Sequence, residues 1–197
     1  MEFFDNIKKR KVILASKSAR RELLLKALGI DFEICVIDVE ENYPDDLQNE
    51  EIAEYLAKQK ADVFQFEDLD DDTLIITADT IVLKKDKLLT KPKNKQEAIE
   101  MLSELSSGMH IVITAVCIKT KHKLKLFHSK SKVYFKSLTQ EEIEYYIDKY
   151  HPYDKAGSYG IQEWIGYIGI EKIEGSYFNV MGLPTQRLYA ELKDMVL

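Results

Sequence analysis

The amino-acid sequence predicts a mixed α/β fold, a twisted β-sheet flanked by helices. Strand-like and helical patterns alternate through the first half of the chain, which is typical of α/β architectures. Two long strand patterns follow each other in the middle, roughly Met109 to Thr120 and Lys123 to Lys136, with polar turn residues between them. The chain has 197 residues, 45% of them hydrophobic, so we expect one domain over residues 1–197, either as one body or as two lobes around a central cleft.

The first half contains five expected elements. A short apolar run is followed by Ser16 or Ser18, which can cap a helix, and Gly29 stops that helix because glycine adopts the left-handed conformation at low cost. Apolar residues recur at helical spacing after Asn49, and Thr73 to Leu83 is the strongest strand pattern in the chain. The expected elements are a strand at 11–15, a helix to about 28, a strand at 32–39, a helix from 49 to about 64 and a strand at 73–83.

Two helices of the second half begin with a capping-box pattern, a polar residue followed three positions later by glutamate. The pairs are Asn94 with Glu97 and Thr139 with Glu142. The remaining expected elements are a hairpin turn at 84–87, a stop for the first of these helices at Gly108, an end of the second near Tyr150, and a final helix with Pro184 in its first turn.

Six of the eight glycines lie between Gly157 and Gly182. This concentration predicts a loop-and-strand region in which the backbone comes close to another group, such as a ligand.

The composition and the apolar runs argue against several classes of partner and location. There are 28 Lys and Arg against 34 Asp and Glu, and the net charge of −6 does not favour a nucleic-acid polymer, whose phosphates attract basic surfaces. No apolar run approaches the roughly 18–20 residues of a membrane span, and the N-terminal residues lack the apolar core of a secretory signal. Cys35 and Cys117 each lie in an apolar run and are expected to be buried free thiols. We therefore expect a soluble, cytoplasmic protein.

Common catalytic and cofactor motifs are absent. The sequence has no Gly-x-Gly-x-x-Gly, no Gly-x-x-x-x-Gly-Lys-Ser/Thr phosphate loop, no Cys-x-x-Cys, and no histidine pair at i and i+4 with a glutamate. These absences argue against redox, zinc-hydrolase and histidine-based nucleophile chemistry.

The segment Ser16-Lys17-Ser18-Ala19-Arg20-Arg21 lies where the first strand meets the first helix. Free backbone N–H groups and the helix dipole make such a junction a natural anion site, and arginines add bidentate donors for phosphate oxygens. An ordinary helix cap followed by a basic surface turn explains the same residues equally well.

Asp79 stands inside the strongest strand, in Ala78-Asp79-Thr80. Burying a lone carboxylate is costly, so this residue needs a cation or a hydrogen-bond donor as partner. It can be a metal ligand, a general base, or a structural aspartate bonded to a neighbouring loop. The aspartate strand of haloacid-dehalogenase phosphatases does not match, because that pattern has a second Asp where this chain has Ile81.

Lys91-Pro92 follows Asp79 by about a dozen residues across a hairpin, which can bring the lysine and the acid to one end of the sheet, although a solvated basic turn is the simpler explanation. Arginines at a helix N-terminus, an acid in a core strand, a nearby lysine and a glycine-rich segment together favour phosphate-ester or phosphoanhydride chemistry with a divalent cation.

These motifs, in this order, resemble the Maf family of nucleotide pyrophosphatases over nearly the whole chain, from about Val12 to Leu192. The matching segments are Leu14 to Arg21, Glu40-Glu41, Leu56 to Ala61, Ala78 to Thr80, Lys91-Pro92, Leu102 to His110, Lys155 to Gln162 and Gly175 to Pro184. The family usually has proline where Ala19 stands and glutamate where Leu23 stands, so a metal-binding or supporting role of that glutamate is in question here.

The resemblance implies a mixed-sheet fold similar to that of inosine-triphosphate pyrophosphatases and a homodimer. It also implies hydrolysis of a nucleoside triphosphate to the monophosphate and pyrophosphate with Mg²⁺ or Mn²⁺. In this interpretation Asp79 is the general base and the cationic side chains balance phosphate charge. The implied site residues are Asp79, Lys60 and Lys91 for catalysis, Glu41 and Asp79 for the metal, and Ser16, Arg20, Arg21, Thr80 and Gln162 for the substrate.

The run ending at Gln162, together with Arg20 and Thr80, resembles the branch that prefers dTTP and UTP over 7-methyl-GTP. A glutamine amide offers a donor and an acceptor, which suits the pairing edge of thymine or uracil, although Gln162 can also simply hold its loop together. A nucleotide-binding regulator of cell division with little turnover, favoured by Leu23, is the alternative, and a purine-directed pyrophosphatase is a third hypothesis.

Overall fold

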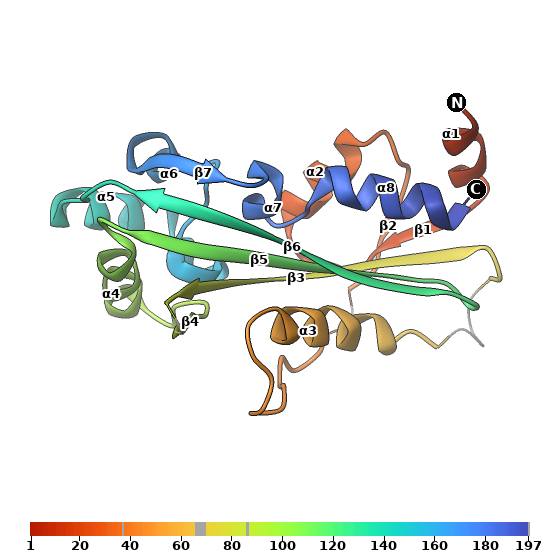
Figure 1. The fold of residues 1–197 in the computed structure, drawn as a ribbon, viewed down its shortest axis with the longest axis horizontal. Helices are drawn as coiled ribbons and strands as arrows, with labels where there is room; N and C mark the ends of the chain where they lie inside the picture. The colour runs from red at the N-terminus through yellow and green to blue at the C-terminus, as the bar shows by residue number, and fades with distance from the viewer. Residues whose placement is uncertain (37, 66–69, 86, 197) are drawn as a thin grey trace. The chain divides into compact units, whose positions relative to one another are not determined.

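A computed structural model describes residues 1–36, 38–65, 70–85 and 87–196 (Figure 1). The chain divides into two compact units, each built from separate stretches of sequence. The first unit contains Met1–Asp79, Thr114–Ser129 and Gly182–Leu197, and the second contains Thr80–Ile113 and Lys130–Met181.

Strands in the described part of the chain form one sheet in the order β2-β1-β3-β5-β6-β7, with β4 paired to β3. The strands are β1 (Lys11–Leu14), β2 (Glu33–Ile34), β3 (Thr73–Lys84), β4 (Lys87–Leu89), β5 (Met109–Lys119), β6 (Leu124–Phe135) and β7 (Ile170–Glu174). Strand β1 pairs in parallel with β2 and β3, whereas the β3–β4 and β6–β7 pairs are antiparallel. The predicted mixed sheet is therefore confirmed.

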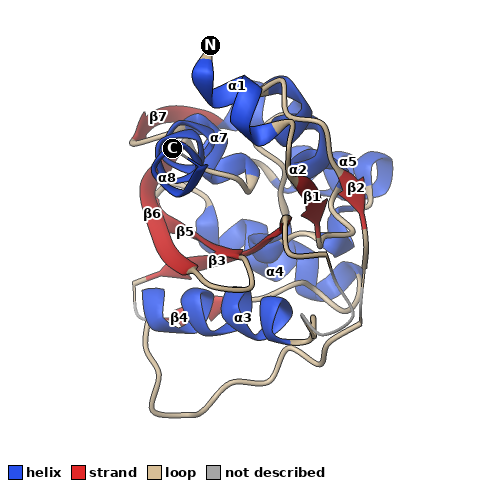
Figure 2. Ribbon diagram, turned by 90° about the vertical axis from the view of Figure 1, so that its right-hand side faces the viewer, coloured by secondary structure: helices blue, strands red, loops and turns tan. Residues whose placement is uncertain are grey.

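The first unit buries strand β1 between parallel neighbours, so Val12, Ile13 and Leu14 form a continuous apolar run without alternation. Helix α3 lies on one face of the strands of this unit and α8 on the other (Figure 2). The N-terminal helix packs against α8 through an edge-to-face contact between Phe3 and Tyr189 with ring centroids 4.7 Å apart. The helices of this unit are α1 (Glu2–Ile7), α2 (Ala19–Ala27), α3 (Glu50–Asp62) and α8 (Thr185–Val196).

The second unit packs its helices against one another at the ends of the long strands. Helix α4 contacts α5, and α5 contacts α6. The capping box of Thr139 and Glu142 forms completely at the start of α5, as predicted. The helices of this unit are α4 (Lys95–Leu105), α5 (Gln140–Tyr150), α6 (Trp164–Gly169) and α7 (Tyr177–Met181), with short 3₁₀ turns at Pro152–Asp154 and Ala156–Ser158.

Three expectations about local structure are wrong. Of the strand expected at 32–39, the described residues form strand only at Glu33–Ile34, which pair with Ile13 and Leu14 of β1, and residue 37 lies outside the described residues. Cys35 is consequently exposed rather than buried, whereas Cys117 is buried and its pKa is raised by that burial to about 11. Helix α4 ends three residues before Gly108.

The glycine-rich region is also more helical than expected, since α6, α7 and a 3₁₀ turn lie within it. Across the described residues, no helix is both long enough and apolar enough to cross a membrane.

Candidate active site

Six of the nine predicted site residues belong to the first unit and three to the second. Those of the first unit are Ser16, Arg20, Arg21, Glu41, Lys60 and Asp79, and those of the second are Thr80, Lys91 and Gln162. The two groups are described in turn.

A lysine lies between two carboxylates in the first unit. Asp79, near the middle of β3, is buried and only 7% exposed. The Nζ atom of Lys60, on α3, lies 2.5 Å from Asp79 Oδ1 and 2.8 Å from Oε1 of Glu41, which belongs to the loop before α3. Asp79 thus has the cationic partner that its place in an apolar strand requires.

A hydrogen bond between α3 and β3 helps to position Lys60 and Asp79. The hydroxyl of Thr77 donates a 2.6 Å hydrogen bond to the backbone carbonyl of Ala57, joining β3 to α3. Lys60 lies three residues after Ala57 and therefore on the same helix face, and Asp79 lies two residues after Thr77 and therefore on the same strand face. The bond between Thr77 and α3 therefore directs the Lys60 ammonium and the Asp79 carboxylate toward each other.

Ser18 caps the N-terminus of α2, because its side chain accepts a hydrogen bond from the backbone N–H of Arg21. The prediction that Ser16 or Ser18 caps this helix is therefore confirmed. Ser16 Oγ accepts from the backbone N–H of Ser18 at 3.2 Å. Burial lowers the pKa of the Arg21 guanidinium, and the nearby Asp79 charge opposes that effect.

Arg21 forms hydrogen bonds that join separate elements of the first unit. Its Nη1 donates to the carbonyl of Ala78 at 2.8 Å, and its Nε donates to the carbonyl of Gly182 at 2.9 Å. These bonds join α2 to the strand residue before Asp79 and to the turn before α8. The predicted contact of Arg21 with substrate, like that of Arg20, stays a prediction.

The carboxylates of Glu41 and Asp79 suit a divalent cation of the kind that phosphate-handling enzymes use. Mg²⁺ is usually held by one or two carboxylates, with phosphate oxygens and water completing its coordination. No cluster of three or more His, Cys, Asp or Glu that could bind a metal occurs among the residues that the structure describes. The predicted metal-binding role of Glu41 and Asp79 stays a prediction.

In the second unit, the segment that carries Gln162 is tied to the segment that carries Lys91. The backbone N–H of Gly157 donates to the carbonyl of Thr90 at 3.2 Å. Gly157 has a φ of +68°, and a Cβ there would lie 3.1 Å from Val82 Cγ1, so a larger residue would be strained in this turn against β3. Gln162 is half-buried, and its Oε1 atom is buried without a hydrogen-bond partner in the described structure.

Sequence reasoning missed a polar network beside Gln162. Glu163 contacts Lys155 and Tyr146 in the interior of this unit. The sequence did carry a signal for Glu163, since it is an acid flanked by the apolar residues Ile161 and Ile165. The same kind of signal drew attention to Asp79.

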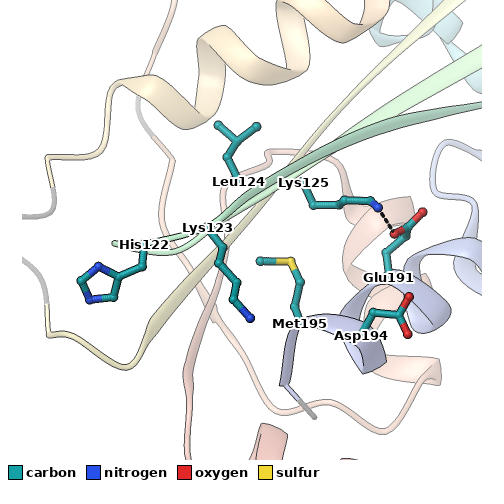
Figure 3. A pocket seen from close by; sticks show the side chains of 7 residues that line it. All are labelled: His122, Lys123, Leu124, Lys125, Glu191, Asp194 and Met195. Atoms are coloured by element: carbon teal, nitrogen blue, oxygen red, sulfur yellow. Dashed lines mark ion pairs between the residues drawn. The ribbon is translucent and has the colours of Figure 1, made fainter.

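A pocket of about 420 Å³ lies elsewhere in the first unit, between the β5–β6 turn and α8 (Figure 3). The ion pair of Lys125 with Glu191, 2.9 Å apart, lies at its side. It contains none of the predicted site residues; its lining residues are His122, Lys123, Leu124, Lys125, Glu191, Asp194 and Met195.

Curated relatives resemble the chain over almost its entire length. A protein of Parabacteroides distasonis named dTTP/UTP pyrophosphatase is 56% identical over 190 residues, covering 96% of this chain and 98% of the relative. Proteins with the same name from Bacteroides fragilis and Flavobacterium johnsoniae are 51% and 50% identical, covering 96% and 98% of this chain and 98% of each relative.

Among solved structures, the Staphylococcus aureus Ham1 protein aligns with a TM-score of 0.44 and 14% identity, over 64% of this chain and 72% of that protein. The profile of the family described as Maf-like protein matches residues 11–195, and the chain belongs to that family.

Proposed function

We propose that this protein is a nucleoside triphosphate pyrophosphatase that hydrolyses dTTP and UTP to the monophosphate and pyrophosphate. The proposal rests mainly on the cluster of Asp79, Lys60 and Glu41, which places a buried carboxylate beside a cation. Family membership and the names of relatives that are 50–56% identical support the choice of substrate.

The reaction breaks the anhydride bond between the first and second phosphates, and a water molecule supplies the new P–O bond. Asp79 accepts the proton that this water loses, and pyrophosphate leaves. Lys60, Lys91 and Arg20 offset the negative charge of the phosphates, and Ser16 donates to a phosphate oxygen. Lys60 donates a hydrogen bond to Asp79 and so orients the base.

Glu41 and Asp79 would hold a divalent cation, Mg²⁺ or Mn²⁺, together with phosphate oxygens. When bound, such an ion neutralises charge on the phosphates and favours departure of pyrophosphate. Removal of divalent ions with a chelator is expected to abolish hydrolysis, and re-addition of Mg²⁺ or Mn²⁺ to restore it.

Gln162 and Thr80 would recognise the base. The buried Oε1 atom of Gln162, unpartnered within the described residues, supports this assignment because an acceptor without a partner is costly unless a ligand satisfies it.

The decisive experiment is product analysis with dTTP, UTP, CTP, GTP, 7-methyl-GTP and ITP in the presence of Mg²⁺ or Mn²⁺. Release of pyrophosphate with dTMP or UMP, lost in the Asp79→Asn variant, is the expected result. Saturable binding of dTTP without any product would instead favour a nucleotide-binding regulator. That alternative is supported by Leu23, which is 60% exposed on α2 where the family usually has glutamate. Turnover of ITP alone would favour a purine-directed enzyme.

We also propose a cytoplasmic homodimer. Nucleoside triphosphates are cytoplasmic metabolites, and the family resemblance implies the dimer. Light scattering coupled to size-exclusion chromatography tests the oligomeric state, since a monomeric mass would refute it.

A further inference from the structure

We infer that Glu163 orients the side-chain amide of Gln162 and thereby sets the preference for a base with an imide N–H, such as thymine or uracil, over cytosine. Glu163 acts as a positioning residue, because it works through Gln162 and not on the nucleotide. The inference rests on the proposed function, in which Gln162 contacts the base.

The carboxylate of Glu163 is held at both of its oxygens. Oε2 accepts from the hydroxyl of Tyr146, and Oε1 lies 3.2 Å from the Nζ atom of Lys155. The side chains of Lys155 and Glu163 are 9% and 18% exposed, so this ion pair is largely shielded from water. A carboxylate with a partner at each oxygen in such surroundings keeps one orientation.

The hydroxyl of Tyr146 joins this carboxylate to the backbone of the loop. It accepts a 2.9 Å hydrogen bond from the N–H of Gly160 while it donates to Glu163. Burial and the bond to Glu163 raise the pKa of Tyr146, so its hydroxyl remains a donor throughout the physiological range. The loop backbone, the phenol and the carboxylate therefore form one rigid chain of hydrogen bonds.

The space around Gly160 shows that the side chains of Glu163 and Gln162 lie close together. A Cβ atom at position 160 would lie 2.9 Å from Gln162 Nε2 and 2.9 Å from Glu163 Oε2, so these two atoms are less than about 6 Å apart. The negative charge of Glu163 attracts the amide NH₂ group and repels the amide oxygen. With Nε2 on the side of Glu163, the amide directs Oε1 away from Glu163, and Oε1 is the buried acceptor for which the described residues supply no donor.

The fixed acceptor suits one class of pyrimidine. The N3 atom of thymine and uracil carries a hydrogen and donates, whereas N3 of cytosine is an acceptor, so an amide oxygen facing it would be repelled. Binding sites that present one committed hydrogen-bonding group discriminate strongly against analogues that leave it unpaired. An amide free to flip would accept either base.

The test compares Glu163→Gln and Tyr146→Phe with the control Glu171→Gln, which makes the same chemical change at an exposed residue of β7. Calorimetry gives the Kd values of dTTP and dCTP for each folded variant, and circular dichroism verifies folding. We expect the preference for dTTP over dCTP to fall about tenfold in Glu163→Gln, corresponding to one lost oriented hydrogen bond, and by less in Tyr146→Phe. The control should keep the wild-type ratio.

A purely structural role of Glu163 would weaken both nucleotides equally and leave the ratio of the two Kd values unchanged. An unchanged ratio in folded Glu163→Gln, or a wild-type protein that binds dTTP and dCTP equally, overturns the inference. Hydrolysis is measured separately on the wild type. Its absence overturns the proposed function, while the Kd ratios still decide the role of Glu163.

Discussion

Replacing Asp79 by asparagine removes the charge of the proposed base and keeps its size. Losing one partner of a fully buried ion pair costs about 3–5 kcal/mol, since the other charge is left alone. Lys60 is not left alone here, because Glu41 remains 2.8 Å from its ammonium, and the Lys60 side chain is 18% exposed. We therefore expect the free energy of unfolding of Asp79→Asn to fall by only about 1 kcal/mol, a smaller loss than a buried unpaired charge would cause.

The effect on catalysis should be far larger. General-base catalysis contributes about 10²–10⁴-fold, and asparagine cannot take up the proton of the attacking water, so we expect turnover of dTTP to fall about 1,000-fold. Pyrophosphate release gives the rate, and urea unfolding gives the stability. Asp62→Asn is the control, because Asp62 is an α3 carboxylate paired with Lys58 and Lys119 at the surface. A folded Asp79→Asn protein with turnover within tenfold of the wild type would refute the assignment of the base.

Three other predictions concern stability and the α2 helix. Burial, with the nearby Lys84 charge adding to it, lowers the pKa of His110 from 6.5 to about 3. Below pH 6.5 the unfolded chain therefore binds a proton that the folded chain does not. The free energy of unfolding should fall by up to about 1.4 kcal/mol per pH unit between pH 6.5 and 3, and His110→Gln should remove that slope in urea titrations. Gly175→Ala should cost about 2 kcal/mol in the same assay, because its φ is +118° and the new Cβ would lie 2.7 Å from Ser131 Oγ; an unchanged midpoint would contradict this. Leu23→Glu should change stability by less than about 0.5 kcal/mol, since Leu23 is exposed, and should raise dTTP turnover, whereas an unchanged rate would show that this chain does not need the family glutamate.

The helix starts could be predicted because their signals are local. Thr139 and Glu142 lie three residues apart and complete their capping box regardless of the rest of the fold. Asn94 likewise caps α4 by accepting from the N–H of Glu97, although the Glu97 carboxylate returns to the N–H of Lys93 instead of that of Asn94.

Strand lengths depend on the partner strand and could not be predicted as well. The apolar run from Phe32 favours a strand, yet its pairing stops at Ile34 because the neighbouring β1 ends at Leu14. Among the described residues of this segment, one more bond, from the N–H of Cys35 to the carbonyl of Leu14, extends the contact. Sequence propensity does not contain the length of a neighbour.

For the site, the sequence showed that Asp79 needs a partner, but its local pattern did not show which residue that partner is. Asp79 in an apolar strand had to have a partner, and Lys60 is that partner, brought by a threonine–carbonyl bond between β3 and α3 that no local pattern predicts. The two adjacent arginines of α2 looked equivalent in sequence. In the structure, Arg21 donates hydrogen bonds to the carbonyls of Ala78 and Gly182. This structural role depends on the tertiary fold and is not visible in the local sequence.

The discontinuous makeup of the first unit has a consequence for synthesis on the ribosome. This unit combines Met1–Asp79 with α8, which begins more than a hundred residues later, at Thr185. The first unit therefore cannot be completed before α8 has been translated, whereas the segments of the second unit are complete at Met181. We expect the first unit to complete its folding only after α8 has been translated, because contacts that span long sequence separations form slowly.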